Sequence, residues 1–147
     1  LFPEIYEDSR VEIRFGNLKS TRDLYCEGDV AIQPSKMEGN GFSIIEAKAS
    51  GIPVITLDYP PMNEVVDDRR LLVKKKWFKR NCLPKNWIKH AHIRLPNIKD
   101  LTRKIEWLAE NDLSEISVSN RVWAEKFFEP SYVQNKWKKE IDSFFNE

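Results

Sequence analysis

Apolar residues occur along this chain in two kinds of run, short β-branched segments and longer stripes with helical spacing. Residues 29–33 and 53–57 are short, largely apolar runs that predict β-strands. Between them, the pattern predicts a helix that begins near Gly41 or Phe42 and ends before Gly51. A strand, a loop, a helix and a second strand within about 30 residues predict a parallel, right-handed βαβ unit. The pattern therefore indicates an α/β fold.

The chain from residue 98 onwards has helical spacing throughout and predicts a helical C-terminal tail. A first helix is predicted by Ile98, Leu101, Ile105 and Leu108, and a second by Ile116, Val122, Trp123, Phe127 and Phe128. A third is predicted to start with a capping box at Ser131, and its apolar stripe is Val133, Trp137, Ile141 and Phe144. We interpret this stripe as core. If a neighbouring domain is missing, we expect some of Tyr132, Trp137 and Phe145 to be exposed.

Two glutamates flank a glycine-bearing turn that follows the first predicted strand. Glu38 lies in the predicted loop 34–41, and Glu46 lies eight positions later in the predicted helix. Ligands of open α/β sheets bind beyond the carboxyl ends of the strands, where this loop must lie. The helix N-terminus beside it offers free N–H groups and a partial positive charge, which suit phosphate. Together these groups are what a sugar linked to a diphosphate needs.

Each glutamate also has a purely structural interpretation. Glu38 is then an ordinary loop carboxylate in water, and Glu46 is a solvated acid on the exposed face of an early helical turn. The neighbours of Glu46 are apolar or small, however, so we expect this helix to be buried on most sides. A buried carboxylate needs a partner, which favours a functional role for Glu46.

Residues 34–54 resemble the Glu-x7-Glu signature of retaining GT-B glycosyltransferases of the family 4 type. The residues that carry the resemblance are Pro34, Ser35, Glu38, Gly39, Gly41, Glu46, Ala47, Ala49, Gly51, Pro53 and Val54. Upstream, residues 11–16, 23–25 and 28–30 match the preceding strand and helix, and downstream, residues 64–68 and 71–73 match the next elements. The resemblance covers residues 9–73 and, more loosely, the helical tail.

The resemblance implies a Rossmann-like doubly wound parallel sheet, which would be the C-terminal, donor-binding domain of such an enzyme over residues 1–147. It also implies transfer of a sugar from a UDP- or GDP-linked donor to an acceptor with retention of anomeric configuration. Neither a cofactor nor a metal is implied, since helix-terminal N–H groups and basic side chains can stabilise the leaving diphosphate.

The resemblance further implies a role for each matched position. Glu38 would be the catalytic residue beside the transferred sugar, and Glu46 would bind the ribose hydroxyls. Backbone groups meeting the sugar and the distal phosphate would come from Gly39, Asn40, Gly41, Phe42 and Ser43. A loop after a strand at residues 11–15 would border the nucleobase through Gly16, Asn17 and Leu18.

Two departures from the family pattern change the expectation. The Arg and Lys that follow the first strand of the domain and grip the diphosphate have no counterpart, because residues 1–10 resemble the tail of a helix before the third strand. We therefore expect a sheet incomplete at its N-terminal side and an acceptor-binding domain that is missing or supplied by a separate chain. The strand at residues 29–33 would have an open edge, which favours a dimer of the fragment. The second departure is a bulky loop at residues 58–63 where the family often has glycines.

Composition narrows these expectations to one domain. A chain of 147 residues is long enough for a single core, and its net charge of +1 gives no whole-molecule field for a polyanion. Cys26 and Cys82 lack metal-ligand spacing and fit a reducing compartment, although a single disulfide stays open. We find no apolar run of about 18 residues and no signal-peptide pattern, and we expect a cytoplasmic location.

Basic residues are concentrated between residues 74 and 94, a segment without any of the 23 acidic residues. A functional interpretation is contact with phosphate, an acidic acceptor or a membrane surface, the last implying peripheral attachment. The alternative is a solvated insertion whose aromatic residues pack onto the domain. No nucleic-acid recognition fold accompanies it, and His90 and His92 alone are a poor zinc pair. We expect an irregular or weakly helical excursion outside the sheet.

Three functions therefore remain open from the sequence. The first is the donor-binding half of a glycosyltransferase that binds a nucleotide sugar. The second is a non-catalytic binding or partner subunit of a split glycosyltransferase. The third is a related phosphorylase or nucleotide-sugar epimerase.

Overall fold

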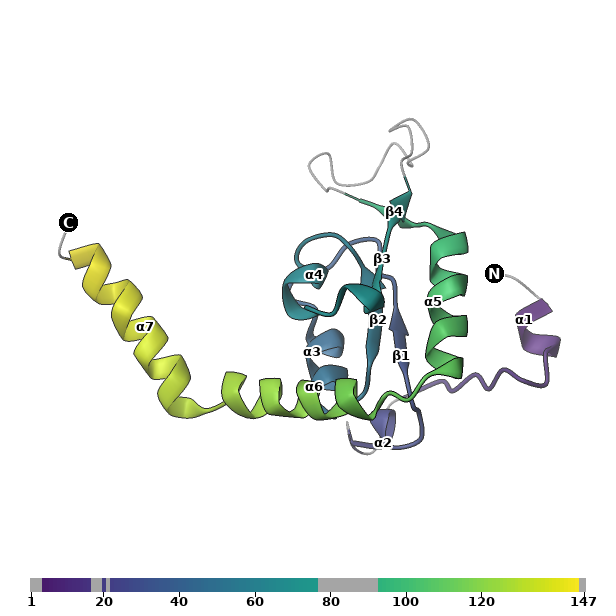
Figure 1. The fold of residues 1–147 in the computed structure, drawn as a ribbon, viewed down its shortest axis with the longest axis horizontal. Coiled ribbons are helices and arrows are strands. Elements are labelled where there is room, and N and C mark those ends of the chain that lie inside the picture. The colour runs from purple at the N-terminus through teal and green to yellow at the C-terminus, as the bar shows by residue number, and fades with distance from the viewer. Residues whose placement is uncertain (1–3, 17–19, 21, 77–92, 146–147) are drawn as a thin grey trace.

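The structure, a computed structural model, describes residues 4–16, 20, 22–76 and 93–145 (Figure 1). In chain order the elements are α1 (Glu4–Glu7), α2 (Arg22–Tyr25), β1 (Ala31–Gln33), α3 (Phe42–Ala49), β2 (Val54–Leu57), α4 (Met62–Val65), the 3-10 helix η1 (Arg69–Leu71), β3 (Leu72–Val73), β4 (Lys75–Lys76), β5 (Leu95–Pro96), α5 (Ile98–Glu110), α6 (Ser114–Phe127) and α7 (Pro130–Phe145).

Three parallel strands form the central sheet in the order β1-β2-β3. Ala31 lies opposite Val54 in the first pairing, and Thr56 lies opposite Leu72 in the second. The βαβ unit predicted over residues 29–57 is therefore confirmed, with α3 as its crossover helix. The α/β fold class is confirmed as well.

Helices cover both faces of this sheet. Figure 1 shows α3 and α4 on one side of the strands and α5 on the other, with α6 passing below α3. All four residues of β2 are buried, as expected for a central parallel strand that has helices on both faces. The core includes Ile44 and Ala47 of α3, Ile55 and Leu57 of β2, Met62, Val73, Leu108 and Ile116.

β1 lies at one edge of this sheet, as the sequence predicted for residues 29–33. Ile32 of β1 is 50% exposed, and in the described part of the chain β1 pairs with β2 alone. A hollow of about 630 Å³ opens beside it, lined by residues that include Ile32, Ile105, Leu108 and Leu113. The open side of β1 therefore continues into a partly apolar hollow between the sheet and α5.

Two buried polar side chains fix α3 and the following turn against α6. Lys48 is 2% exposed and donates to the Val65 carbonyl at 2.8 Å and to Asp67 Oδ1 at 2.9 Å. Its Nζ also lies 4.2 Å from the centroid of the Trp123 ring of α6. Asn120 of α6 is buried and donates to the Ile52 carbonyl at 3.0 Å. The ammonium group of Lys48 therefore links three parts of the chain: α3, the segment at the end of α4, and α6.

A buried carboxylate anchors the segment that leaves β3. Asp100, in the first turn of α5, accepts the Lys74 backbone N–H at 2.7 Å and a hydrogen bond from Arg103. Burial raises the pKa of Asp100, but the Lys74 N–H and the charges of Lys104 and Arg103 lower it more, so the net shift is downward. The carboxylate form is thereby favoured, and it holds the start of β4 against α5.

The strand predicted over residues 11–15 does not form. These residues have no regular secondary structure, and Phe15 is 83% exposed. Arg14 pairs with Glu12 at 2.7 Å and with Glu27 at 2.6 Å. A strand needs a neighbour to satisfy its backbone groups, and no described strand pairs with this segment. The resemblance that implied a strand over these residues therefore gave a wrong prediction here.

The helical tail is confirmed over residues 98–145, with two corrections in α7. Glu129, rather than Ser131, caps this helix, because its carboxylate accepts the Tyr132 N–H at 2.9 Å and a bond from Ser131 Oγ. The stripe interpreted as core is exposed, and Trp137 is 65% accessible. Figure 1 shows α7 extending away from the sheet and the other helices. The described residues offer this stripe no surface on which to pack.

The basic insertion contains the short strand β4, which corrects part of the prediction of irregular or weakly helical structure for residues 74–94. β4 pairs antiparallel with β5, in a two-stranded ribbon separate from the parallel sheet. Asn97 donates its backbone N–H to the Lys74 carbonyl at 2.8 Å and closes the base of this ribbon. Residues 93–94 have no regular secondary structure, and residues 77–92 lie outside the described residues.

We expect Lys48→Met to lower the free energy of unfolding by about 2–4 kcal/mol, because it leaves the Val65 carbonyl without its donor. The measurement is urea denaturation followed by circular dichroism. Lys99→Met, at an exposed position of α5, is the matched control and should change stability by less than about 0.5 kcal/mol. Equal stability of the two variants would contradict the proposed role of Lys48.

Candidate functional site

The loop predicted to carry the site, residues 34–41, follows the carboxyl end of β1. Gly41 ends this loop as the N-cap of α3, with φ +65°. Only glycine adopts this backbone conformation readily, and a Cβ here would meet Ile44 Cδ1 at 3.4 Å. No side chain caps α3, and the Ile44 N–H donates to the Gly41 carbonyl at 2.9 Å, so the N–H groups of Phe42 and Ser43 stay available to an anion.

A network of hydrogen bonds joins the two glutamates through α3. Gln33, the last residue of β1, donates from Nε2 to Glu38 Oε1 at 3.3 Å and also to Ser43 Oγ. Tyr25 of α2 lies with its hydroxyl 3.1 Å from the Ser43 carbonyl and 3.4 Å from Glu46 Oε2. Strand β1, helix α2, the loop and α3 therefore all contribute to one polar site.

The position of Gln33 is itself held by the sheet. The buried hydroxyl of Thr56 in β2 donates to the Gln33 carbonyl at 3.0 Å. Gln33 also lies opposite Thr56 in the parallel register. The backbone from which Gln33 reaches Glu38 and Ser43 is thus fixed by strand pairing and by a side-chain bond.

The structure corrects the expected environment of Glu46. This residue is exposed, because the buried face of α3 consists of Ile44, Ala47 and Lys48. Its carboxylate therefore needs no internal partner, and the contact from Tyr25 orients it without enclosing it. Glu38 is half-buried in the loop. Both carboxylates are accessible to a ligand on the side of the network.

Other predicted site residues fall into two groups. Gly39, Asn40, Gly41, Phe42 and Ser43 form the turn and the first turn of α3, so the structure places them between the two glutamates. Gly16 is exposed, with φ +104°, in the segment that Arg14 ties to Glu27, and the described contacts do not bring it to the network. Asn17 and Leu18 lie outside the described residues.

Sequence reasoning missed two side chains of this network. Gln33 gave a weak signal, since it is a polar residue at the end of an otherwise apolar strand. Tyr25 gave none, because it comes from a separate helix whose approach to α3 depends on tertiary packing. Burial, followed by the nearby Glu46 charge and its hydrogen bond, raises the pKa of Tyr25 above the ordinary tyrosine value. The hydroxyl therefore stays protonated and can donate.

The described residues contain neither a group of metal ligands nor a membrane-spanning helix. No three His, Cys, Asp or Glu side chains within those ranges come together as a group that could hold a metal ion. Among the described helices, none is both long enough and apolar enough to cross a membrane.

The sequence of this chain matches a known protein family. A family model described as "Glycosyl transferases group 1" matches residues 13–122. A Klebsiella pneumoniae protein described as an uncharacterized 41.2 kDa protein in cps region is 31% identical over 68 residues. That match covers 46% of this chain and only 19% of the Klebsiella protein. No solved structure matches the chain.

We expect the Tyr25 hydroxyl to titrate above the ordinary tyrosine pKa of about 10. Glu46→Gln should lower the pKa of Tyr25 without returning it to the ordinary value, because burial is the larger cause of the shift. Ultraviolet pH titration of both proteins measures this difference. In a Tyr25→Phe background the effect of Glu46→Gln on the tyrosine signal should vanish, and its persistence would place Glu46 beside another tyrosine.

Proposed function

This chain belongs to the group 1 glycosyltransferases, and we propose that it binds the nucleotide-sugar donor at the N-terminus of α3. The network that joins Glu38 and Glu46 through Gln33, Ser43 and Tyr25 carries this proposal. It holds the carboxylates of Glu38 and Glu46, which can accept hydrogen bonds from sugar hydroxyls, one on each side of a helix N-terminus. The reaction would transfer a sugar from a UDP- or GDP-linked donor to an acceptor with retention of anomeric configuration.

Glu46 would bind the ribose. Its carboxylate is exposed on α3 and is oriented from one side by the Tyr25 hydroxyl, 3.4 Å away. A carboxylate has two oxygens that accept hydrogen bonds, which suits two neighbouring hydroxyls of one ring. Such bonds are charge-assisted and stronger than bonds between neutral groups.

The first turn of α3 would bind the distal phosphate. Its N–H groups lack a side-chain cap, and Gly41 brings no side chain between them and a ligand. Negative charge develops on the diphosphate as it leaves the sugar, and preorganised N–H donors stabilise that charge. This stabilisation supports the proposal that transfer needs no metal.

Glu38 would lie beside hydroxyls of the transferred sugar. It is half-buried, and the side-chain amide of Gln33, a residue of β1, donates to its carboxylate at 3.3 Å. This bond limits the orientations that the Glu38 side chain can take within the loop. A carboxylate positioned in this way can favour the transition state over the bound donor. The proposed order along the site is therefore ribose at Glu46, phosphate at the helix N-terminus and sugar at Glu38.

The direct test is a calorimetric screen of UDP- and GDP-linked sugars against the protein that contains this chain. Proton NMR of the product, recorded before any anomerisation, reports whether the configuration of the donor is retained. Activity that survives prolonged dialysis against a chelator would support metal-independent transfer. Binding of no nucleotide sugar would refute the proposed donor site.

We expect Glu46→Gln to weaken binding of the nucleoside diphosphate by about 1–3 kcal/mol, the scale of a lost charge-assisted hydrogen bond. Titration calorimetry measures the change. Glu110→Gln makes the same chemical change at an exposed position of α5 and should leave affinity unaltered. Unchanged affinity in Glu46→Gln would remove the ribose role.

We expect Glu38→Ala to reduce turnover far more than it reduces affinity for the bare nucleoside diphosphate, because the diphosphate lacks the sugar that Glu38 contacts. Steady-state kinetics and calorimetry on the same variant separate the two effects. Glu38→Gln keeps a hydrogen-bonding side chain next to Gln33 and is the matched variant for loop structure. Equal losses of affinity for nucleoside diphosphate and nucleotide sugar would instead place Glu38 at the nucleotide.

A further inference from the structure

Two cations share one aromatic ring beyond the carboxyl end of β2. Tyr59 follows that strand closely, and its ring centroid is 5.3 Å from Lys75 Nζ and 4.9 Å from the guanidinium carbon of Arg94. Lys75 belongs to β4, and Arg94 directly precedes β5. The antiparallel ribbon therefore brings both side chains to the same ring.

A third cation lies on the same edge of the sheet, in the loop that carries Glu38. The backbone N–H of Arg94 donates to the carbonyl of Lys36 at 3.1 Å. The ribbon itself follows β3 directly, as Figure 1 shows. This bond holds the Lys36 backbone beside Arg94, so the loop that carries Glu38 adjoins the ribbon that carries Lys75 and Arg94.

These three cations have no acidic partner among the described residues. Some cations elsewhere in the described chain pair with carboxylates, namely Arg10, Arg14, Lys48, Arg70, Arg103 and Arg121, and others, such as Lys99, do not. Arg70 gives the closest contrast, since it also lies over a ring, 5.1 Å from the Trp107 centroid, yet pairs with Asp68 at 2.7 Å. Within the same described residues, Arg94 donates from Nη1 to its neighbour's carbonyl at 2.9 Å and its other guanidinium donors are unused.

Electrostatics favours an anion at this position. A ring face attracts a cation by only about 0.5–1 kcal/mol at an exposed site, which does not remove the repulsion between two cations. A phosphate group would neutralise both charges, accept two parallel bonds from the guanidinium of Arg94 and take a further bond from Lys75. The Tyr59 hydroxyl, which has no partner within the described residues, can donate as well.

We propose that Lys75 and Arg94, which lie over the Tyr59 ring, form a binding site for a phosphate group, with Lys36 in the adjoining loop adding positive charge. Two sources share this chemistry: the diphosphate of a soluble nucleotide, and the phosphate of a lipid headgroup. The site deepens the proposed function, because it rests on the same edge as Glu38. It can nevertheless be tested without any nucleotide.

The test compares two double variants that remove the same charge. Arg94→Gln with Lys75→Gln disrupts the site, and Arg70→Gln with Lys99→Gln removes an arginine from a ring and a lysine from α5 elsewhere. Each protein is titrated calorimetrically with inorganic diphosphate and with UDP, and sedimented with vesicles of pure phosphatidylcholine or of phosphatidylcholine containing phosphatidylglycerol. Circular dichroism and thermal melting confirm that each variant is folded.

The expected result is at least about tenfold weaker binding of one phosphate source by the first double variant only, the scale of one or two charge-assisted bonds. Loss confined to diphosphate and UDP assigns the site to a soluble ligand, and loss confined to phosphatidylglycerol vesicles assigns it to a headgroup. Tyr59→Phe should keep the cations in place and weaken the same ligand by a smaller factor. Arg94→Lys, which keeps the charge, should restore part of the affinity.

Two results would overturn the proposal. One is that the unaltered protein binds neither diphosphate nor phosphatidylglycerol vesicles, and the other is an equal loss in both double variants. Failure of the proposed donor site can be distinguished from failure of the phosphate site. If only the donor site is wrong, Glu46→Gln leaves the affinity for UDP unchanged, while the protein still binds inorganic diphosphate through Arg94 and Lys75.

Discussion

Parallel pairing of β1 with β2, across the helix α3, is the constraint on which the rest of the described structure depends. The register of Gln33 opposite Thr56 makes both strands end at the same edge of the sheet. The loop with Glu38 and the residue Tyr59 therefore emerge side by side, although they are far apart along the chain. An antiparallel pairing would have sent them to opposite edges, and neither the glutamate network nor the proposed phosphate site could have formed.

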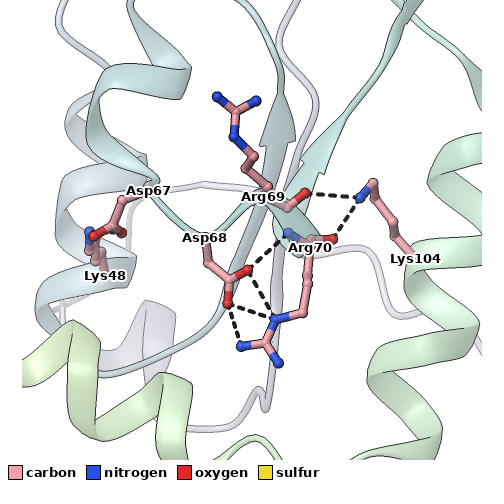
Figure 2. A network of polar contacts seen from close by, with 6 residues as sticks. All are labelled: Lys48, Asp67, Asp68, Arg69, Arg70 and Lys104. Carbon is pink, nitrogen blue, oxygen red and sulfur yellow. Dashed lines mark hydrogen bonds and ion pairs between the residues drawn. The ribbon is translucent and has the colours of Figure 1, made fainter.

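The edge of the sheet at which the parallel strands begin differs in electrostatic character from the edge at which they end. At the edge where β3 begins, Figure 2 shows Asp67 beside Lys48, and Asp68 bonded to the guanidinium and backbone of Arg70. Lys104 donates there to the carbonyls of Arg69 and Arg70. Bonds from Arg70 lower the pKa of Asp68, which keeps it charged. The charges of Lys48, Asp67, Asp68 and Arg70 at this edge are thus paired within the protein, which suits a stabilising role.

At the opposite edge, several charges have no partner of opposite sign among the described residues. Lys36, Lys75 and Arg94 lie without carboxylate partners among the described residues, and Glu46 is exposed with only a long contact from Tyr25. Unsatisfied charge of this kind is acceptable in water and becomes useful when a ligand supplies the partner. The asymmetry follows from topology. In a parallel sheet the loops that follow the strands gather at one edge, and the C-termini of the helices that lead into the strands gather at the other.

The sequence by itself determined the local elements, including the loop that carries Glu38 and the helix that carries Glu46. Hydrophobic spacing, Gly41, Gly51 and Pro53 were sufficient for β1, α3 and β2, because those signals act within a few residues. Tertiary structure alone decided what each element contacts. It left residues 11–15 without a strand partner and the α7 stripe exposed, and it brought Tyr25 to Glu46 and Arg94 to Tyr59. Pairing, burial and charge proximity depend on residues distant in the chain, so no local pattern could have specified them.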